Sequence, residues 1–283
     1  MKKPQFIVIL FALALISIIY FFAPRYKQSP DQLAKISVDN QDITSNSIID
    51  GATVNLSPEQ KISLLTIQNQ LKKATTTIDS ITAYKRISRF WADSAQKMGP
   101  YLYYTYSAAL LENSEKSLTF AAQLLVDNLT NPEAPPALLK WMAGNAKALL
   151  DKALVINPNN DSAKINLGAC YLFGNISDNP MQGILKVKEV VDKNPHNTYG
   201  QMILALGGKK SGQYEKAIER FILVLKDQPN NIEAMVNLAE SYELSNQKQL
   251  ALEWYTKVKE NKVIRIPQEA KDAIDKRIQL LKK

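Results

Sequence analysis

Cysteine and histidine are almost absent from this chain. Its 283 residues include one cysteine, Cys170, and one histidine, His196. A single cysteine cannot close an intramolecular disulfide, which excludes a disulfide-stapled secreted scaffold. A single histidine excludes a His-rich metal site and leaves little room for Ser-His or Cys-His chemistry. We therefore expect no metal and no other cofactor.

The chain also lacks a long stretch in which one sign of charge dominates. The net charge is +8, yet residues 36–197 hold 15 basic and 15 acidic residues. The excess comes from residues 1–35, with five basic residues and one acidic residue, and from residues 198–283, with 15 basic and 11 acidic residues. No basic stripe with interleaved aromatic residues is present, so we expect no nucleic-acid partner.

One long apolar run lies near the amino terminus. Residues 6–23 read FIVILFALALISIIYFFA, and Lys2 and Lys3 make residues 1–5 basic. At a rise of about 1.5 Å per residue the run spans roughly 27 Å, close to the ~30 Å of a bilayer core. We predict a transmembrane anchor that places residues 6–23 in the lipid bilayer.

Two other interpretations of this run stay open. A cleaved signal peptide needs small residues in an A-x-A arrangement, whereas residues 20–24 read YFFAP. A buried helix of a soluble protein is disfavoured by the basic flanks and the terminal position. No cysteine follows closely, so a lipoprotein anchor is excluded.

The orientation of the predicted anchor follows from a weak asymmetry of charge. Lys2, Lys3 and the terminal amine precede the run, and Arg25 and Lys27 follow it. A signal-anchor arrangement places the amino terminus inside. We therefore expect a single-pass protein of the inner (cytoplasmic) membrane with a periplasmic body.

The body of the chain is predicted to be all-α. Residues 24–56 are polar and irregular, typical of a linker with at most one short helix. A lead-in helix is predicted over residues 57–80, with Ser57 as N-cap, Pro58 at the first position and Gln60 completing a capping box. From there to Lys283, apolar residues recur at intervals of three and four, and no alternating strand pattern appears.

A proline-centred segment recurs in the second half of the chain. The three copies read NPNN, NPHN and QPNN at residues 157–160, 194–197 and 228–231. Their prolines are Pro158, Pro195 and Pro229. The second and third of these are 34 residues apart, and the first and second are 37 apart, which is 34 plus an insertion of three.

The units between these prolines share further positions. In residues 232–265, Leu238, Ala239 and Tyr242 mark a first helix, and Ala251 and Tyr255 mark a second. This resembles the tetratricopeptide repeat (TPR) pattern W-x₂-L-G-x₂-Y…A-x₃-F…P. The resemblance implies an α-solenoid of helix-turn-helix units. We predict repeats at residues 161–197, 198–231 and 232–265, divergent TPR-like units with an insertion at 81–160, and a capping helix at 266–283.

Local strings of the body, such as LLKWMAGNAKALLDKAL, are also similar to membrane-anchored, exported tetratricopeptide proteins of Bacteroidetes. That resemblance implies a location and no reaction.

The residues that invite a chemical role are better explained by structure. His196 occupies a position where the other copies of the segment have asparagine, so we expect a turn. Cys170 lies in a helix with small residues, so we expect it to be buried. Residues 207–212 read GGKKSG, which lacks the strand context and spacing of a phosphate loop, so we expect helix packing and a turn at Gly212. We predict no catalytic residue, and hence no enzyme.

The resemblance implies that the first helix of each repeat lines a partner-binding groove. Chaperone-binding members hold a terminal carboxylate with a clamp of Lys, Arg and Asn. Here Asn166 and Asn237 match the asparagine places alone, so a clamp is not expected. The groove so predicted has an apolar middle and one acidic end, suited to an apolar or basic segment. Its residues are Ile165, Ala169, Leu172, Tyr199, Met202, Leu206, Lys209, Glu240 and Glu243.

The sequence thus predicts a non-catalytic, membrane-anchored scaffold for protein–protein interaction. An alternative is an accessory or assembly factor of a cell-envelope or cytochrome-biogenesis system that presents a client protein. The sequence does not identify the protein or peptide partner, and self-association stays open.

Overall fold

A computed structural model describes residues 43–131, 133–177, 179–264 and 266–283. The predicted anchor at residues 6–23 and the first part of the predicted linker lie outside the described residues. No helix within the described ranges combines the length and apolar character that crossing a bilayer requires.

The described chain is entirely helical, as the sequence predicts. Thirteen α-helices and one short π-helix, η1, follow one another, and the described residues contain no β-strand. The elements are α3 (Ser45–Thr53), α4 (Pro58–Lys72), α5 (Thr77–Arg89), η1 (Phe90–Ser94), α6 (Met98–Glu112), α7 (Glu115–Val126), α8 (Pro136–Ile156), α9 (Asp161–Phe173), α10 (Met181–Val191), α11 (Thr198–Lys210), α12 (Tyr214–Asp227), α13 (Ile232–Leu244), α14 (Lys248–Lys259) and α15 (Gln268–Leu281).

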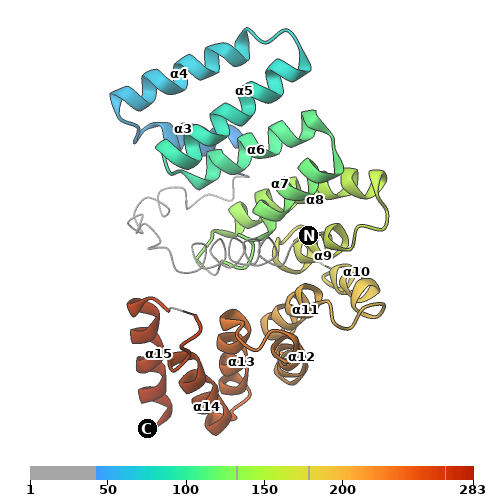
Figure 1. Cartoon of the computed structure of the whole chain (residues 1–283), viewed down its shortest axis with the longest axis vertical. Coiled ribbons are helices and arrows are strands. Elements are labelled where there is room, and N and C mark those ends of the chain that lie inside the picture. Colours follow the sequence, from blue (N-terminus) through green and yellow to red (C-terminus); the bar gives the residue numbers. More distant parts are fainter. Residues whose placement is uncertain (1–42, 132, 178, 265) are drawn as a thin grey trace, which may run out of the picture. The chain divides into compact units, whose positions relative to one another are not determined.

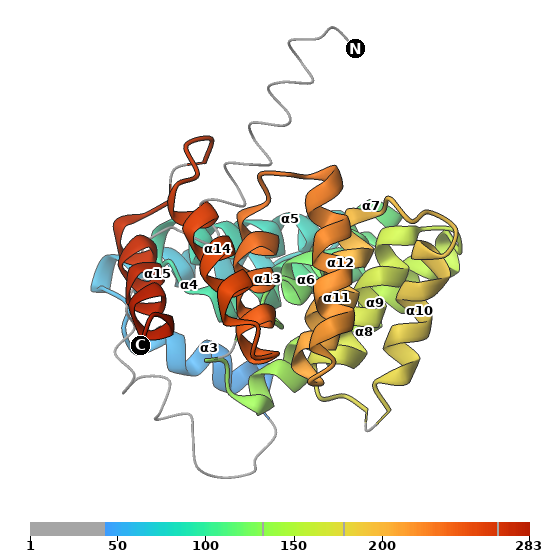
Figure 2. The same cartoon turned by 90° about the horizontal axis from the view of Figure 1, so that it is seen from below.

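Two compact units divide the described chain, and the division falls within α11, after Gly207. In the first unit each helix from α4 to α10 packs against the next, and α3 packs against α6 (Figures 1 and 2). In the second unit α12, α13, α14 and α15 pack in the same sequential way. Each of the three predicted repeats contains one pair of helices, and α15 lies within the predicted cap.

The recurring segment explains how each pair begins. Its last residue is an asparagine whose Oδ1 accepts a hydrogen bond from a backbone N–H in the first turn of the next helix. The bonds run from Ala163 N to Asn160 (2.8 Å), from Gly200 N to Asn197 (2.9 Å) and from Ala234 N to Asn231 (2.9 Å). Such a bond satisfies one of the helix's orphan donors.

The predicted lead-in helix at residues 57–80 is wrong in its extent. Its start is confirmed, because Ser57 and Gln60 form the expected capping box. The helix ends at Lys72, however, and α5 begins at Thr77. Thr76 causes the restart, since its Oγ1 accepts a hydrogen bond from Asp79 N at 3.1 Å and so caps a new helix. The structure also contains the one short helix, α3, that the linker allowed.

Small residues let paired helices approach closely. Gly168 of α9 faces Gly183 of α10, and a Cβ added to Gly168 would lie 2.8 Å from the Gly183 carbonyl oxygen and in collision with Val187. The same contact exists from the other side, where a Cβ on Gly183 would lie 2.5 Å from the Gly168 carbonyl oxygen. Since backbone meets backbone there, neither position accepts a side chain without separating the helices.

We predict that Gly168→Ala destabilises the chain. Overpacking of this kind typically lowers the free energy of unfolding by about 1–3 kcal/mol. Gly144 of α8 provides the matched control, because a Cβ there meets nothing within 4 Å. Gly144→Ala is expected to stabilise the helix by about 0.5–1 kcal/mol. Urea unfolding followed by circular dichroism measures both, and equal midpoints for the two variants would contradict the close-approach interpretation.

Candidate functional site

A buried polar network joins three first helices of the first unit. Asn166 of α9 donates from Nδ2 to Oε1 of Gln123 in α7 at 2.7 Å. Its Oδ1 accepts from the hydroxyl of Tyr199 in α11 at 2.5 Å. Gln123 also donates from Nε2 to the Tyr199 hydroxyl oxygen at 3.2 Å, so the three side chains are linked pairwise. Residues 76 positions apart in the sequence therefore meet at one amide.

Because this network is buried, it contributes to the stability of the fold. The Asn166 side chain is fully buried, with 0% exposure, and the network occupies its amide donor and acceptor alike. Leaving either atom unpaired there would cost about 1–3 kcal/mol. Gln123 also donates to Asp127 at 2.6 Å, and desolvation raises the pKa of that carboxyl group while the hydrogen bond opposes the rise.

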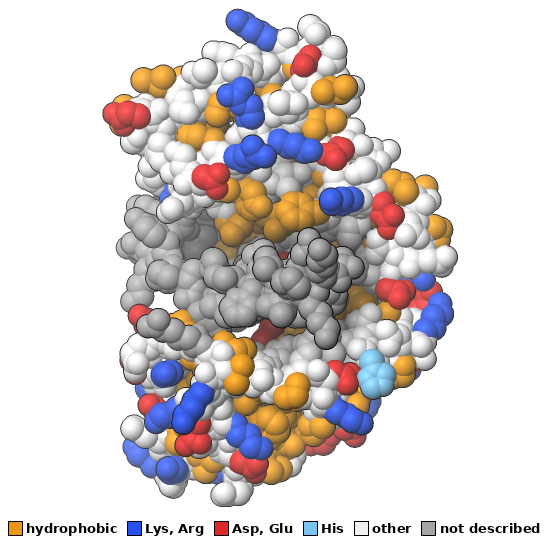
Figure 3. Space-filling view, in the orientation of Figure 1, with side chains coloured by type: hydrophobic (Ala, Val, Ile, Leu, Met, Phe, Trp, Pro, Cys, Tyr) orange, Lys and Arg blue, Asp and Glu red, His pale blue; other side chains and the backbone are white. Residues whose placement is uncertain are grey.

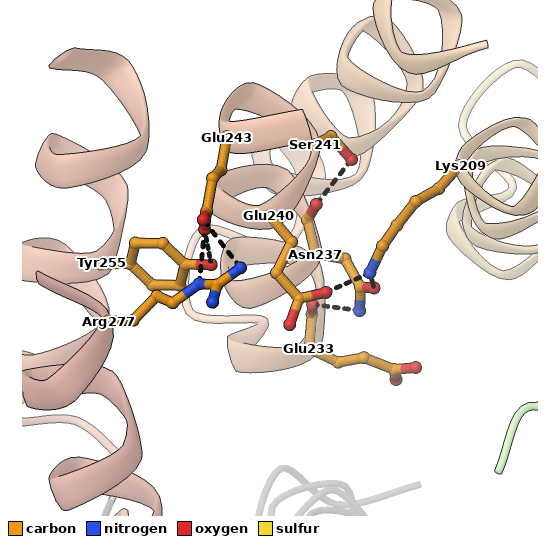
Figure 4. A network of polar contacts seen from close by, with 8 residues as sticks. All are labelled: Lys209, Glu233, Asn237, Glu240, Ser241, Glu243, Tyr255 and Arg277. Atoms are coloured by element: carbon orange, nitrogen blue, oxygen red, sulfur yellow. Dashed lines mark hydrogen bonds and ion pairs between the residues drawn. The ribbon is translucent and has the colours of Figure 1, made fainter. Parts of the chain in front are cut away.

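A second network lies on α13 in the other unit (Figure 4). The Lys209 ammonium donates to Oδ1 of Asn237 at 2.8 Å and forms an ion pair with Glu240. Asn237 in turn donates from Nδ2 to the Glu233 carbonyl oxygen at 2.9 Å. The asparagine place of the repeat is thus filled in both units by contacts within the chain.

Glu243 is the centre of a third set of polar contacts. Its carboxylate accepts from Arg277 of α15 at 2.7 and 2.8 Å and from the Tyr255 hydroxyl of α14 at 3.1 Å (Figure 4). Desolvation raises the pKa of Tyr255, and the nearby carboxylates raise it further. The hydrogen bond to Glu243 raises the pKa of Arg277. Three consecutive helices meet at this carboxylate, so it fastens the capping helix to the last repeat.

The predicted groove residues therefore fall into two groups. Ile165, Ala169, Leu172 and Met202 are buried, with 9% exposure or less, so their expected exposure in a groove is wrong. The protein's own helices cover them because successive pairs stack so closely. The other five, Tyr199, Leu206, Lys209, Glu240 and Glu243, keep partial exposure, and their role in partner binding stays a prediction.

Two residues of these networks were missed by sequence reasoning. Gln123 lies in the weakly matching unit, where the repeat register is hard to set. Arg277 lies on the capping helix, and no local signal connects it to a glutamate 34 residues earlier. Tyr255 was recognised as a repeat position and not as a partner for Glu243.

The residues whose side-chain types could support catalysis or ligand binding have structural roles instead. His196 is exposed in the turn before α11, where its backbone N–H donates to Oδ1 of Asn194 at 3.2 Å. Gly212 has φ +76° and forms the turn between α11 and α12, as expected for residues 207–212. Across the described ranges, no group of His, Cys, Asp and Glu side chains is arranged to hold a metal ion.

Cys170 is buried in α9 with 0% exposure, as predicted. Desolvation raises the pKa of its thiol from 9.0 to about 12. Because the thiolate is the nucleophile, the thiol is protonated and inert throughout the neutral range.

We predict that Cys170 does not react with a maleimide at pH 7–8 in the native chain. Labelling is expected to be complete once the chain is unfolded in urea, since the pKa then falls to its ordinary value. Mass spectrometry measures the modified fraction. Rapid labelling of the native chain would contradict the burial of this thiol.

We also predict that Tyr199→Phe destabilises the first unit. Removing the hydroxyl leaves Oδ1 of buried Asn166 without its donor, at an expected cost of about 1–3 kcal/mol. Tyr214→Phe removes the same atom from a partly exposed tyrosine outside both networks and is expected to change stability by less than about 0.5 kcal/mol. Chemical unfolding of the two variants checks the difference. An equal effect would assign the Tyr199 hydroxyl no structural role.

Comparisons with known proteins give structural neighbours and no close relative. No protein-family model matches the chain, and no curated protein matches it. Among solved structures, MamA of Desulfovibrio magneticus RS-1 is 22% identical over 64% of this chain and 93% of that chain, with a TM-score of 0.44. A tetratricopeptide repeat protein of Parabacteroides merdae is 13% identical over 79% of this chain and 87% of that one, with a TM-score of 0.41.

A third similar structure is YrrB, described as a TPR protein with an unusual peptide-binding site. It is 18% identical over 68% of this chain and 90% of its own, with a TM-score of 0.39.

Proposed function

We propose that this chain is a membrane-anchored scaffold of tetratricopeptide type that binds protein partners and catalyses no reaction. The observation that carries the proposal is the succession of helix pairs, of which the pairs beginning at α9, α11 and α13 are each opened by an asparagine cap. First helices of successive pairs adjoin one another, as α7 and α9 do. Such stacking creates an extended surface, which repeat proteins use for binding.

The side chains that could act in catalysis are buried or already paired within the chain, which supports a non-catalytic role. Cys170 is buried and protonated, while Glu240 and Glu243 hold Lys209 and Arg277. A carboxylate already paired with a cation is a poor general base, because its charge is neutralised and its lone pairs are occupied.

The location is part of the same proposal. Its support is the apolar run at residues 6–23 with the flanking Lys2 and Lys3, which favours a single-pass inner-membrane protein with a periplasmic body. The similarity of local strings to exported tetratricopeptide proteins of Bacteroidetes agrees with that placement. A role in assembling a cell-envelope or cytochrome system is a narrower form of the proposal and rests on location alone.

Site-specific photo-crosslinking of the full chain in membranes of its source cell tests the scaffold proposal. A benzophenone amino acid replaces Val236, a partly exposed residue on the first helix α13 between Glu233 and Glu240. The matched control replaces Leu223 on the second helix α12, which is 43% exposed. We predict discrete crosslinked products from position 236 and few from position 223.

The identities of the products discriminate between the alternatives. A product of twice the chain mass would indicate self-association, and envelope or cytochrome assembly proteins would favour the narrower role. Equal crosslinking from both positions would contradict a binding surface on the first helices.

A further inference from the structure

The first helix of the array that packs in sequence, α4, has an outer face that no other described element covers. Its inner face is anchored by Leu64, which is 2% exposed and belongs to the cluster around Trp91. On the opposite side, Ile62 is 67% exposed and Leu65 is 58% exposed. Adjacent exposed aliphatic side chains are a feature of surfaces that contact a partner or a membrane.

Lysines lie on the same side of the helix as these two aliphatic residues. Positions 61, 62, 65, 69, 72 and 73 fall on one side of a helix with 3.6 residues per turn, which places Lys61 beside the Ile62–Leu65 patch and Lys72 and the C-cap residue Lys73 about two turns farther along. Figure 3 shows basic and apolar side chains in the region of α4 at the top of the view, with uncharged polar surface between them and acidic side chains nearby. We call residues 61, 62, 65, 69, 72 and 73 the outer face of α4.

Acidic residues are missing from this part of the chain. Residues 60–78 contain no Asp and no Glu, and residues 57–97 hold seven basic and three acidic residues. Within the described part of the chain, Lys61, Lys72 and Lys73 form no ion pair, whereas nearby Lys85 pairs with Glu112 at 2.5 Å. The exact charge balance of residues 36–197 had hidden this local excess of +4.

A hollow at the carboxyl end of α4 extends the basic region. It has a volume of about 300 Å³ and lies between α4 and α5, lined in part by Lys73, Arg86 and Asp79. Arg86 donates to Oε1 of Gln70 at 2.7 Å, so its guanidinium is held in place by a neutral acceptor. Lys73 and Arg86 thus present two cations to the same small volume, against the one carboxylate of Asp79.

We propose that the outer face of α4 rests on the surface of a bilayer that contains anionic lipid. This inference depends on the proposed anchoring by residues 6–23, which keeps α4 near the membrane. Ile62 and Leu65 enter the interfacial layer, while the lysine stems lie along it with their ammonium groups among the head groups. The contact orients the array relative to the membrane.

Charge decides between this occupant and a second copy of the chain. Two copies meeting through this face would bring six lysines together without a carboxylate to offset them. An anionic lipid surface attracts the same lysines, with about 1 kcal/mol for each lysine near the surface.

The experiment reports the environment of the outer face in the full chain. Asn69→Cys places an exposed thiol at its centre for an environment-sensitive fluorophore, and native Cys170 is too buried to compete. The labelled chain is reconstituted in phosphatidylcholine vesicles with or without phosphatidylglycerol, and a quencher is attached to the lipid tails. Quenching is expected with phosphatidylglycerol at low salt, and it is expected to fall at high salt.

Charge variants supply the matched comparison. Lys61→Gln, Lys72→Gln and Lys73→Gln together are expected to weaken the docking equilibrium by roughly 100-fold, about fivefold for each lysine. Lys276→Gln, Lys282→Gln and Lys283→Gln remove the same charge from the carboxyl-terminal end and are expected to leave quenching unchanged. Equal losses in the two triple variants, or quenching that ignores lipid charge, would overturn the proposal.

Two further outcomes distinguish a failure of the docking proposal from a failure of the anchor proposal. Energy transfer between differently labelled copies, without quenching by lipid, would show that a second copy covers the face and that the bilayer does not. Flotation of the chain with vesicles at high salt reports the anchor alone. A chain that floats without quenching refutes the docking of α4 and leaves the anchor intact, whereas a chain that fails to float refutes the anchor.

Discussion

The close approach of helices at small residues is the constraint on which the rest of this structure depends. At Gly168 and Gly183 backbone lies against backbone, and the small residues Ala121 and Ala122 of α7 and Ala143 and Ala146 of α8 are buried in the core with 2% exposure or less. A helix pair of this size cannot enclose a core of its own, so each pair gains stability by stacking on its neighbours. Close contacts bury the predicted groove residues Ile165 and Ala169 as a direct result, because little space is left between adjacent first helices.

Asparagine side chains make the stacking of helix pairs regular. Asn160, Asn197 and Asn231 cap successive first helices, so the chain restarts each pair with the same local geometry. Asn166 and Asn237 then join adjacent first helices laterally through hydrogen bonds of their amide groups. The caps fix where a helix begins, and the lateral bonds fix which neighbour it meets. The caps use only the acceptor of a short side chain, whereas the lateral bonds use the amide donor of Asn166 and the amide acceptor of Asn237; asparagine supplies both kinds of group.

Local and periodic features of the fold were predictable, and long-range polar pairing was not. The capping box at Ser57, the turn at Gly212 and the helix pairs of the three repeats follow from residue type and spacing over a few turns. The restart at Thr76 was missed because a single threonine cap interrupts an otherwise helical pattern. The ion pair between Glu243 and Arg277 was missed for a different reason, since it depends on how α15 packs on α13 and α14. For the candidate site, the helices were predicted, but the burial of Ile165, Ala169, Leu172 and Met202 was not.

The internal pairing of the groove residues constrains what a partner can gain there. A basic segment that binds Glu240 or Glu243 must displace Lys209 or Arg277, so its net electrostatic gain is the difference between two similar contacts. Affinity on the first helices therefore has to come mainly from shape and apolar contact. The outer face of α4 differs in kind, because its lysines pair with no carboxylate in the described part of the chain and its aliphatic residues are already exposed. Under the proposed anchoring and docking, long-range attraction by charge would act at α4, and selective contact would act at the first helices farther along the chain.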